Sequence, residues 1–345
     1  MRQQLELESS LRSSDSRSWF VGPDALVACY PVFAVMDHQE STYDPQRRRL
    51  SQRLRRHLCS AAFCAALTAH EGISHAQEAA PPRVELRHNL NVELPAVGGL
   101  AVVVVGFRLL RDDLEPSSCR ICDSSVPGRV NAIDGWFRGE LKYSDTGPVN
   151  VVSYVLAFGL APVSAAGLTM LAAHADQRDS EDLVDVVAIA EGGFAAMLAT
   201  EVLESTTLRM RPYVHAIEDP AERDRVIAQK GAFHSFPAGH VVETFGLAAA
   251  SGVVAGRRGY RLAPLVWGAG LTLGFATAYT RIAADRHYFT DVLAGAAIGT
   301  VVGGGVPFLL HPQAPGAAGA GWARRTRLAV MPLPHGTMIG FGGTF

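Results

Sequence analysis

The sequence predicts an all-α protein, a helical bundle embedded in a membrane with about five or six apolar helices. The prediction rests on six apolar segments, on the polar stretches between them and on their content of small residues. The segments are 94–110, 149–173, 183–203, 241–255, 262–279 and 292–310. Small residues let helices approach closely, as packed membrane bundles require. Buried helices of a soluble all-α protein would have the same composition, and the shortness of several segments favours that alternative.

The length and charge of the chain narrow the classes of protein. With 345 residues it is long enough for one large domain or two small ones. A net charge of −2 gives no strong field for nucleic acid or for an acidic partner. The sequence contains no zinc-type Cys/His cluster and no Gly-rich loop followed by Lys and Ser or Thr. We therefore expect neither a metal nor a cofactor.

The N-terminal region is predicted to hold a leader and a signal peptide. Residues 1–46 show no sustained periodicity, which indicates a disordered leader or a mis-called start, with Met36 as an alternative start. Residues 47–76 run from a block of arginines through a short apolar stretch to Ser74-His75-Ala76, the order of a secretory signal peptide. The apolar stretch is shorter than the ~20 residues that a bilayer span needs. An Ala-rich amphipathic helix is the alternative.

The remaining chain divides into three parts. We expect a linker, an apolar segment and an extracytoplasmic loop over 77–148, a core over 149–311, and a tail over 312–345. Within the loop, Cys119 and Cys122 form a lone pair of cysteines, which predicts a local disulfide outside the cytosol or two inert thiols.

Three short motifs stand at the ends of apolar segments. They are Leu208-Arg209-Met210-Arg211-Pro212-Tyr213, then Ser235-Phe236-Pro237-Ala238-Gly239-His240, and then Thr280-Arg281 followed by His287 and Asp291. Singly, each has an ordinary structural explanation, such as a helix end or a surface ion pair. Their joint occurrence at helix ends indicates a site.

The residue types in these motifs suit phosphate chemistry. The planar forks of Arg211 and Arg281 match phosphate oxygens. Gly239 at a helix start lets backbone N–H groups approach an anion. His240 and His287 have side chains that titrate near neutrality and can divide the roles of nucleophile and acid. Asp291 lies one helical turn beyond His287, a spacing that fits a carboxylate orienting a histidine.

On these motifs, residues 150–310 resemble the type 2 phosphatidic acid phosphatase family, whose core is shared with bacterial class A acid phosphatases and vanadium haloperoxidases. The resemblance implies an all-α bundle and a metal-independent phosphatase. It assigns His287 as nucleophile, Asp291 as its orienting carboxylate and His240 as acid. It implies that Arg211, Arg281 and the Gly239 amide hold the phosphate. Thr280 stands where the family pattern has Ser.

Two positions depart from the family pattern. Ala238 replaces a Ser, which removes one hydroxyl that would bond the phosphate. Glu204 replaces a Lys, which places an anion where the family has a cation. Arg209 is the candidate to compensate for that lysine. These departures leave the expected activity reduced.

Three functions fit the resemblance. The first is a membrane phosphohydrolase that acts on a lipid phosphate or diphosphate through a phosphohistidine, with its site on the extracytoplasmic side. The second is a soluble exported acid phosphatase of broad specificity. The third is a catalytically weakened protein that binds phosphorylated ligands or serves as a scaffold. The partners expected are a phosphorylated lipid or small molecule and a membrane, with no nucleic acid.

The topology leaves one question open. Segments three to six put the three motifs on one side and the basic stretch 257–261 on the other, so the positive-inside rule places the motifs outside. A cleaved signal peptide followed by six spans would invert this core. Either the leader is retained inside, or 94–110 does not cross.

Overall fold

The structure is a computed structural model that describes residues 84–114, 118–121, 123, 126–228, 231–314, 326–333 and 336–343. The predicted leader (1–46) and signal peptide (47–76) lie outside the described residues. The prediction of an all-α core is confirmed. Each of the six apolar segments forms a helix or a run of consecutive helical segments, and a two-stranded antiparallel hairpin follows the core.

The main helices extend a few residues beyond the predicted apolar segments. They are α3 (Leu90–Leu114), α5 (Thr146–Tyr154), the π-helix η2 (Val155–Leu160), α6 (Ala161–Ala175), α7 (Asp182–Thr207), α10 (Gly239–Arg258), α11 (Ala263–Ala283) and α12 (Phe289–Leu310). Shorter elements are α4 (Ala132–Leu141), the 3-10 helix η3 (Asp179–Glu181), α8 (Pro212–His215) and α9 (Pro220–Ile227). The hairpin strands are β1 (Thr326–Leu333) and β2 (Gly336–Gly343).

Local sequence signals set several helix ends. The side chain of Asn131 accepts a hydrogen bond from the backbone N–H of Asp134 and caps α4. Asp145 caps α5 in the same way through the N–H of Gly147. Helix α10 ends at Gly259, whose φ of 72° lies in the left-handed region that glycine adopts without strain.

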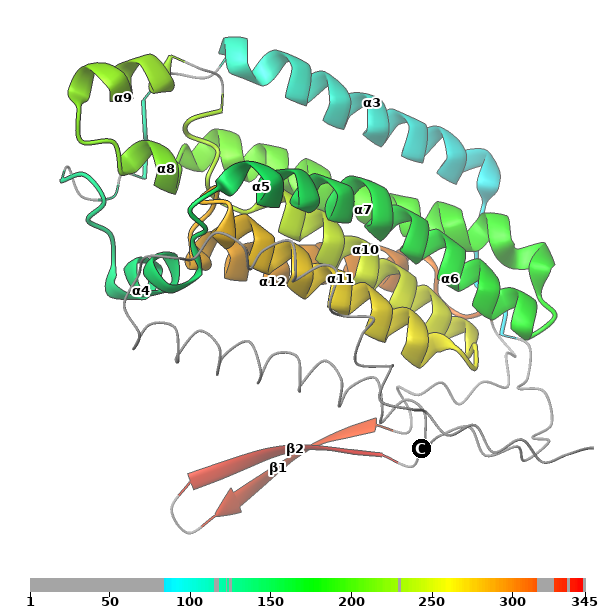
Figure 1. Cartoon of the computed structure of the whole chain (residues 1–345). Helices are drawn as coiled ribbons and strands as arrows, with labels where there is room; N and C mark the ends of the chain where they lie inside the picture. The colour runs from blue at the N-terminus through cyan, green and yellow to red at the C-terminus, as the bar shows by residue number, and fades with distance from the viewer. Residues whose placement is uncertain are drawn as a thin grey trace, which may run out of the picture. The chain divides into compact units, whose positions relative to one another are not determined.

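Helix α10 lies at the centre of the bundle and packs on α6, α7, α11 and α12 (Figure 1). Most of its side chains are buried. Its contact with α12 is made by backbone, since a Cβ on Gly303 would lie 2.4 Å from the carbonyl oxygen of Gly246. The same atom on Gly299 would lie 2.4 Å from the carbonyl oxygen of Val242. Small residues thus bring these helices together as the sequence predicted.

Four stretches of the described chain are long and apolar enough to cross a membrane, fewer than the five or six predicted. They are Leu90–Arg111, Thr146–Ala175, Asp179–His215 and Phe289–Leu310. The central helix α10 is not among the four stretches because polar residues, among them the buried Glu243 and Thr244, lower its mean hydropathy. Helix α11 is not among the four stretches because its glycine, threonine and tyrosine residues lower its mean hydropathy. The outer helices instead expose large apolar side chains, such as Val102 of α3 at 73%.

The two ends of the bundle are chemically distinct. At one end, the C-terminal ends of α7 and α11 meet the N-terminal ends of α10 and α12, which is where the three motifs lie. At the other end, Arg258 and Tyr260 both bond Asp185 at the start of α7. His311, which follows α12, bonds Glu191 of α7 with an Nε2–Oε2 distance of 2.7 Å. The motifs therefore share one end of the bundle, and the basic stretch 257–261 lies at the opposite end.

Candidate active site

The turn after α7 gives two neighbouring arginines different surroundings. Leu208 caps the helix in the left-handed conformation with φ of 45° and is fully buried. Beyond it, Arg209 and Arg211 are separated by one residue. The guanidinium of Arg209 bonds carboxylates, whereas that of Arg211 bonds backbone carbonyls and a histidine.

Arg209 is held by carboxylates. It bonds Asp291 at 2.6 Å, Asp134 at 3.0 Å and Asp123 at 3.1 Å. Burial raises the pKa of Asp134, but hydrogen bonds from Thr290, Arg209 and Asn131 outweigh it and hold the pKa below its ordinary value. The expectation that Arg209 would replace the missing family lysine is wrong, because its guanidinium is directed at these three carboxylates and Arg209 does not line the cavity at this end of the bundle.

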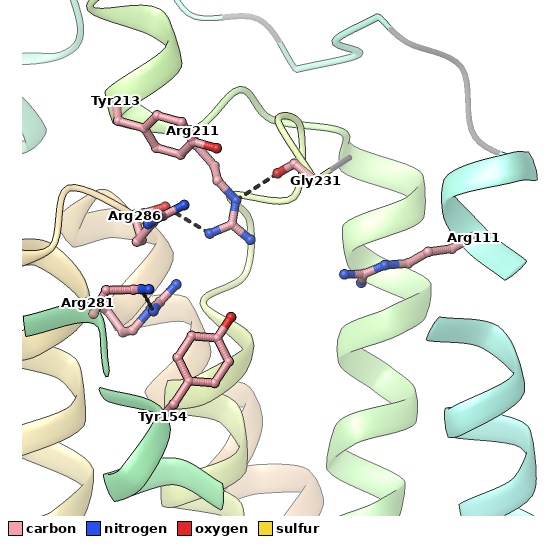
Figure 2. Close-up of a pocket in the computed structure, with 8 residues that line it drawn as sticks. Arg111, Tyr154, Arg211, Tyr213, Gly231, Arg281 and Arg286 are labelled. Carbon is pink, nitrogen blue, oxygen red and sulfur yellow. Dashed lines mark hydrogen bonds between the residues drawn. The ribbon is translucent and has the colours of Figure 1, made fainter. Parts of the chain in front are cut away.

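A cavity of about 230 Å³ opens at the motif end of the bundle. Its lining residues are Arg111, Asn150, Tyr154, Arg211, Tyr213, Gly231, Arg281 and Arg286 (Figure 2). Four of the eight are arginines and none is acidic. Since guanidinium forks match the oxygens of phosphate, this lining fits a phosphate group and disfavours a cationic ligand.

Two of the predicted phosphate ligands, Arg211 and Arg281, lie on this cavity. Nε of Arg211 donates to the carbonyl of Gly231 at 2.9 Å, which fixes its fork. Arg281 is nearly fully buried and donates to Asn150 Oδ1 and Ser153 Oγ, both at 2.9 Å. These partners are neutral, so both arginines keep their full positive charge toward a ligand.

His287 lies beside Arg211, and its tautomer follows from its hydrogen bonds. Nδ1 lies 2.6 Å from the carbonyl oxygen of Ser235, which can only accept, so Nδ1 carries the proton. Nε2 is then the nitrogen with a lone pair, and it lies 3.4 Å from a guanidinium nitrogen of Arg211. Burial, followed by the charges of Arg211 and Arg281, lowers the pKa of His287 well below its ordinary value. A neutral imidazole in this tautomer can act as a nucleophile through Nε2.

Asp291 does not hydrogen-bond His287 in the described structure, and Ser235 stands between them. The hydroxyl of Ser235 donates to Asp291 Oδ2 at 2.6 Å, while its carbonyl accepts from His287. The backbone N–H of Tyr288 also donates to Asp291, at 2.9 Å. The carboxylate thus fixes the segment that holds the histidine rather than the ring itself.

His240 lies near the cavity at the start of α10. Its ring packs edge-on against Tyr154, a cavity residue, with ring centroids 4.5 Å apart, and against Phe158 at 4.9 Å. Its Nε2 is buried and has no hydrogen-bond partner in the described structure. A ring nitrogen without a partner among the described residues is available to exchange a proton with a ligand or water.

Three predicted site positions lie next to the cavity without lining it. Ala238 is fully buried and donates its backbone N–H to the carbonyl of Asp291. Gly239 begins α10, and a Cβ there would lie 3.3 Å from Oε1 of Glu204. The hydroxyl of Thr280 donates to the carbonyl of Thr277 within its own helix. Thr280 therefore points its donor away from the expected phosphate.

Glu204 is buried and paired with an arginine that the sequence did not suggest. Its Oε2 accepts from Arg111 of α3 at 2.6 Å. The sequence offered no reason to join these residues, because they are 93 residues apart and Arg111 belongs to none of the three motifs.

Several other side chains in and around the cavity were missed. They are Arg111, Asn150, Ser153, Tyr154, Tyr213, Ser235 and Arg286. Tyr213 and Ser235 were quoted within motifs without a role, and Arg286 directly precedes His287 of the third motif, so their positions in the sequence were a usable signal. Asn150 and Tyr154 come from a helix without a motif, and only the fold brings them to the site.

Helix α4 braces the loop between α11 and α12. Arg138 bonds both carboxylate oxygens of Asp285, at 2.6 and 2.7 Å, and Lys142 bonds the same group at 3.1 Å. Phe137 stacks on Phe289 with ring centroids 3.7 Å apart. The loop that carries Arg286 and His287 is therefore fixed from outside the core, a role that the polar stretch 111–148 did not reveal. Cys119, in the same stretch, is disulfide-bonded, and its expected partner Cys122 lies outside the described residues.

Comparison with known families identifies the class of protein. Residues 185–312 match the PAP2 superfamily. The predicted resemblance to the type 2 phosphatidic acid phosphatases is thereby confirmed over these residues, and the match implies a phosphatase-type activity on phosphate esters. No curated protein and no solved structure matches the chain.

Proposed function

We propose that this protein is a phosphohydrolase that acts on a lipid phosphate or diphosphate through a covalent phosphohistidine. One observation carries the proposal. The arginine-lined cavity includes Arg211, and a guanidinium nitrogen of Arg211 lies 3.4 Å from Nε2 of the buried His287, the ring nitrogen with the lone pair. A cationic cavity next to a nucleophile is the arrangement that phosphoryl transfer needs, because charge spreads over the phosphate oxygens in the transition state.

The proposed first step transfers the phosphoryl group to the enzyme. Burial, followed by the charges of Arg281, Arg211 and Arg108, lowers the pKa of His240, so this ring takes up its proton only when the phosphate anion binds and offsets those charges. Nε2 of His287 then attacks phosphorus, the bond from phosphorus to the leaving oxygen breaks, and His240 gives its proton to that oxygen. Arg211 and Arg281 stabilise the equatorial oxygens. The carbonyl of Ser235 accepts from Nδ1 throughout, so the cationic ring that forms is stabilised by a fixed dipole.

The second step returns the enzyme to its starting state. His240, now neutral, takes a proton from water, and the water oxygen attacks phosphorus as the bond to Nε2 of His287 breaks. The first step releases the free alcohol from a monophosphate, or the monophosphate from a diphosphate, and the second step releases inorganic phosphate. Neither step uses a metal ion in this proposal.

Lipid is the proposed substrate because the outer helices expose apolar side chains and four stretches could span a bilayer. We place the site on the extracytoplasmic side, since the basic stretch 257–261 lies at the opposite end of the bundle. In that orientation the chain enters α3 from the cytoplasmic end, because Arg178 and Arg258, at that end, both bond the carbonyl of Val84. A cleaved signal peptide over 47–76 is incompatible with this orientation, so we favour a retained leader.

Protein purified in detergent, with chelator present, tests the function directly. It should release inorganic phosphate from a lipid phosphate or diphosphate, and His287→Ala should abolish release without lowering the melting temperature by more than a few degrees. Rapid quench should trap an acid-labile phosphoenzyme in the wild type. A wild type that binds phosphate but hydrolyses none of the lipid or soluble esters would instead indicate a weakened, ligand-binding protein. Preference for a soluble ester would indicate the exported acid phosphatase.

A further inference from the structure

Arg111 joins the cavity from outside the three motifs. It lies near the C-terminal end of α3, and Figure 2 shows it reaching toward the side where Arg211 and Arg281 lie. The family pattern supplies a lysine from α7 at the position that Glu204 occupies. The structure instead brings a cation into the cavity lining from a different helix.

Two glutamates of α7 hold Arg111 in place. One of its terminal nitrogens lies 2.8 Å from Glu201 Oε2 and 2.6 Å from Glu204 Oε2. Arg108, one turn earlier on α3, also bonds Glu201. The two arginines and the two glutamates are each spaced by three residues, so two successive turns of α3 face two successive turns of α7.

The pairing also resolves the charge problem that Glu204 poses. An unpaired carboxylate beside a phosphate would repel it, and a buried one would be strongly disfavoured. Paired with Arg111, Glu204 contributes no net charge, and the cavity lining contains the arginine but not the glutamate. A guanidinium carries five N–H donors, so it can bond a carboxylate with one part of its fork and a phosphate with another.

We propose that Arg111 binds the substrate phosphate in place of the family lysine, with Glu204 as its positioning residue. The inference rests on the proposed function, since it names a further ligand for the same phosphate. It also gives Glu204 a positive role: the acidic residue at the lysine position is what directs the replacement cation from α3 into the cavity.

A pair of double variants tests the proposal without leaving a buried glutamate unpaired. Arg111→Ala/Glu204→Gln removes the cation together with the carboxylate, and Glu201 retains Arg108. It should lower kcat/KM for the phosphate ester, and raise the inhibition constant of inorganic phosphate, by about tenfold or more. Arg111→Ala/Glu204→Lys restores a cation at the family position and should recover at least threefold of the loss.

Arg108→Ala is the matched control, because Arg108 also pairs with Glu201 but does not line the cavity. It should change the phosphate inhibition constant by less than about threefold. Wild-type inhibition by phosphate in Arg111→Ala/Glu204→Gln would overturn the assignment of Arg111. A wild type that hydrolyses no ester, or whose activity survives His287→Ala, would instead refute the proposed function, so the two failures are distinguishable.

Discussion

Ser235 and Asp291 are joined by a buried hydrogen bond of 2.6 Å from hydroxyl to carboxylate. Because the carbonyl of the same serine accepts from His287, this bond positions the backbone that sets the histidine tautomer. Ser235→Ala should therefore lower kcat more than it raises KM. It should also reduce the free energy of unfolding by about 1–3 kcal/mol, since Asp291 loses a buried donor. Steady-state kinetics and denaturant unfolding measure the two effects.

Ser251 provides the control for this variant. It is equally buried, but its hydroxyl donates to the carbonyl of Leu247 within its own helix, far from the motif end. Ser251→Ala should leave kcat and KM unchanged. An unchanged kcat in Ser235→Ala as well would show that Asp291 does not act through Ser235.

His240 should matter most for substrates whose leaving oxygen needs a proton. Its buried Nε2 has no protein partner in the described structure, which suits a group that gives its proton to the ester oxygen. His240→Ala should lower kcat/KM for an alkyl phosphate by roughly 10²–10⁴-fold. The loss should be much smaller for 4-nitrophenyl phosphate, whose leaving group is stable as an anion. Equal losses for the two substrates would remove His240 from the role of acid in the first step.

Substitution of Arg209 should mainly lower stability, whereas substitution of Arg211 should mainly lower phosphate binding. Arg209→Leu leaves Asp123, Asp134 and Asp291 without their shared cation, so the free energy of unfolding should fall by about 3–5 kcal/mol. Arg211→Leu removes a cation that forms no salt bridge with a carboxylate among the described residues and that lines the cavity with other arginines. That variant should stay folded, with a melting temperature close to wild type, and lose phosphate binding. Comparable destabilisation by both substitutions would contradict this division.

The buried His287 predicts how stability depends on pH. Its folded-state pKa lies below the unfolded value of about 6.5, so the unfolded chain binds a proton that the folded protein excludes. The contribution of the neutral His287 to the free energy of unfolding is fully present above pH 6.5. It decreases as the pH falls toward the folded pKa, by up to about 1.4 kcal/mol per pH unit. His287→Gln cannot titrate, so its melting temperature should fall less than that of wild type between pH 7 and pH 5. Parallel curves would show that His287 is not held neutral.

Much of the fold could be predicted because hydrophobic segments and helix ends are local properties. All six apolar segments form helical stretches, and motif spacing brought Arg211 and Arg281 to one cavity, with His287 beside it. Four helical stretches of the described chain are long and apolar enough to span a membrane, slightly fewer than the five or six apolar helices predicted, because polar residues lower the hydropathy of helices such as α10. Sequence composition does not reveal which helix is central.

The parts that could not be predicted depend on contacts between distant residues. Arg111 and Glu204 are 93 residues apart, as are Arg108 and Glu201, and no local pattern links them. The roles of Arg209 and Arg211 also required the structure, since only the left-handed turn at Leu208 shows that the two point to different partners. Ser235 was quoted as part of a motif, but its link between Asp291 and His287 uses its carbonyl as well as its side chain, and a backbone atom leaves no trace in the sequence.

The residues that line the cavity show which part of the chain a truncated protein must keep to retain the site. Arg111, Asn150 and Tyr154 all precede residue 185, where the match to the PAP2 superfamily begins. A polypeptide cut at that boundary would keep both histidines and lose three of the eight lining side chains, together with the helix that carries the partner of Glu204. The segment that matches the family is therefore shorter than the segment that supplies the cavity lining. Transplanting or comparing this protein by residues 185–312 alone would omit the part of the cavity that α3 and α5 supply.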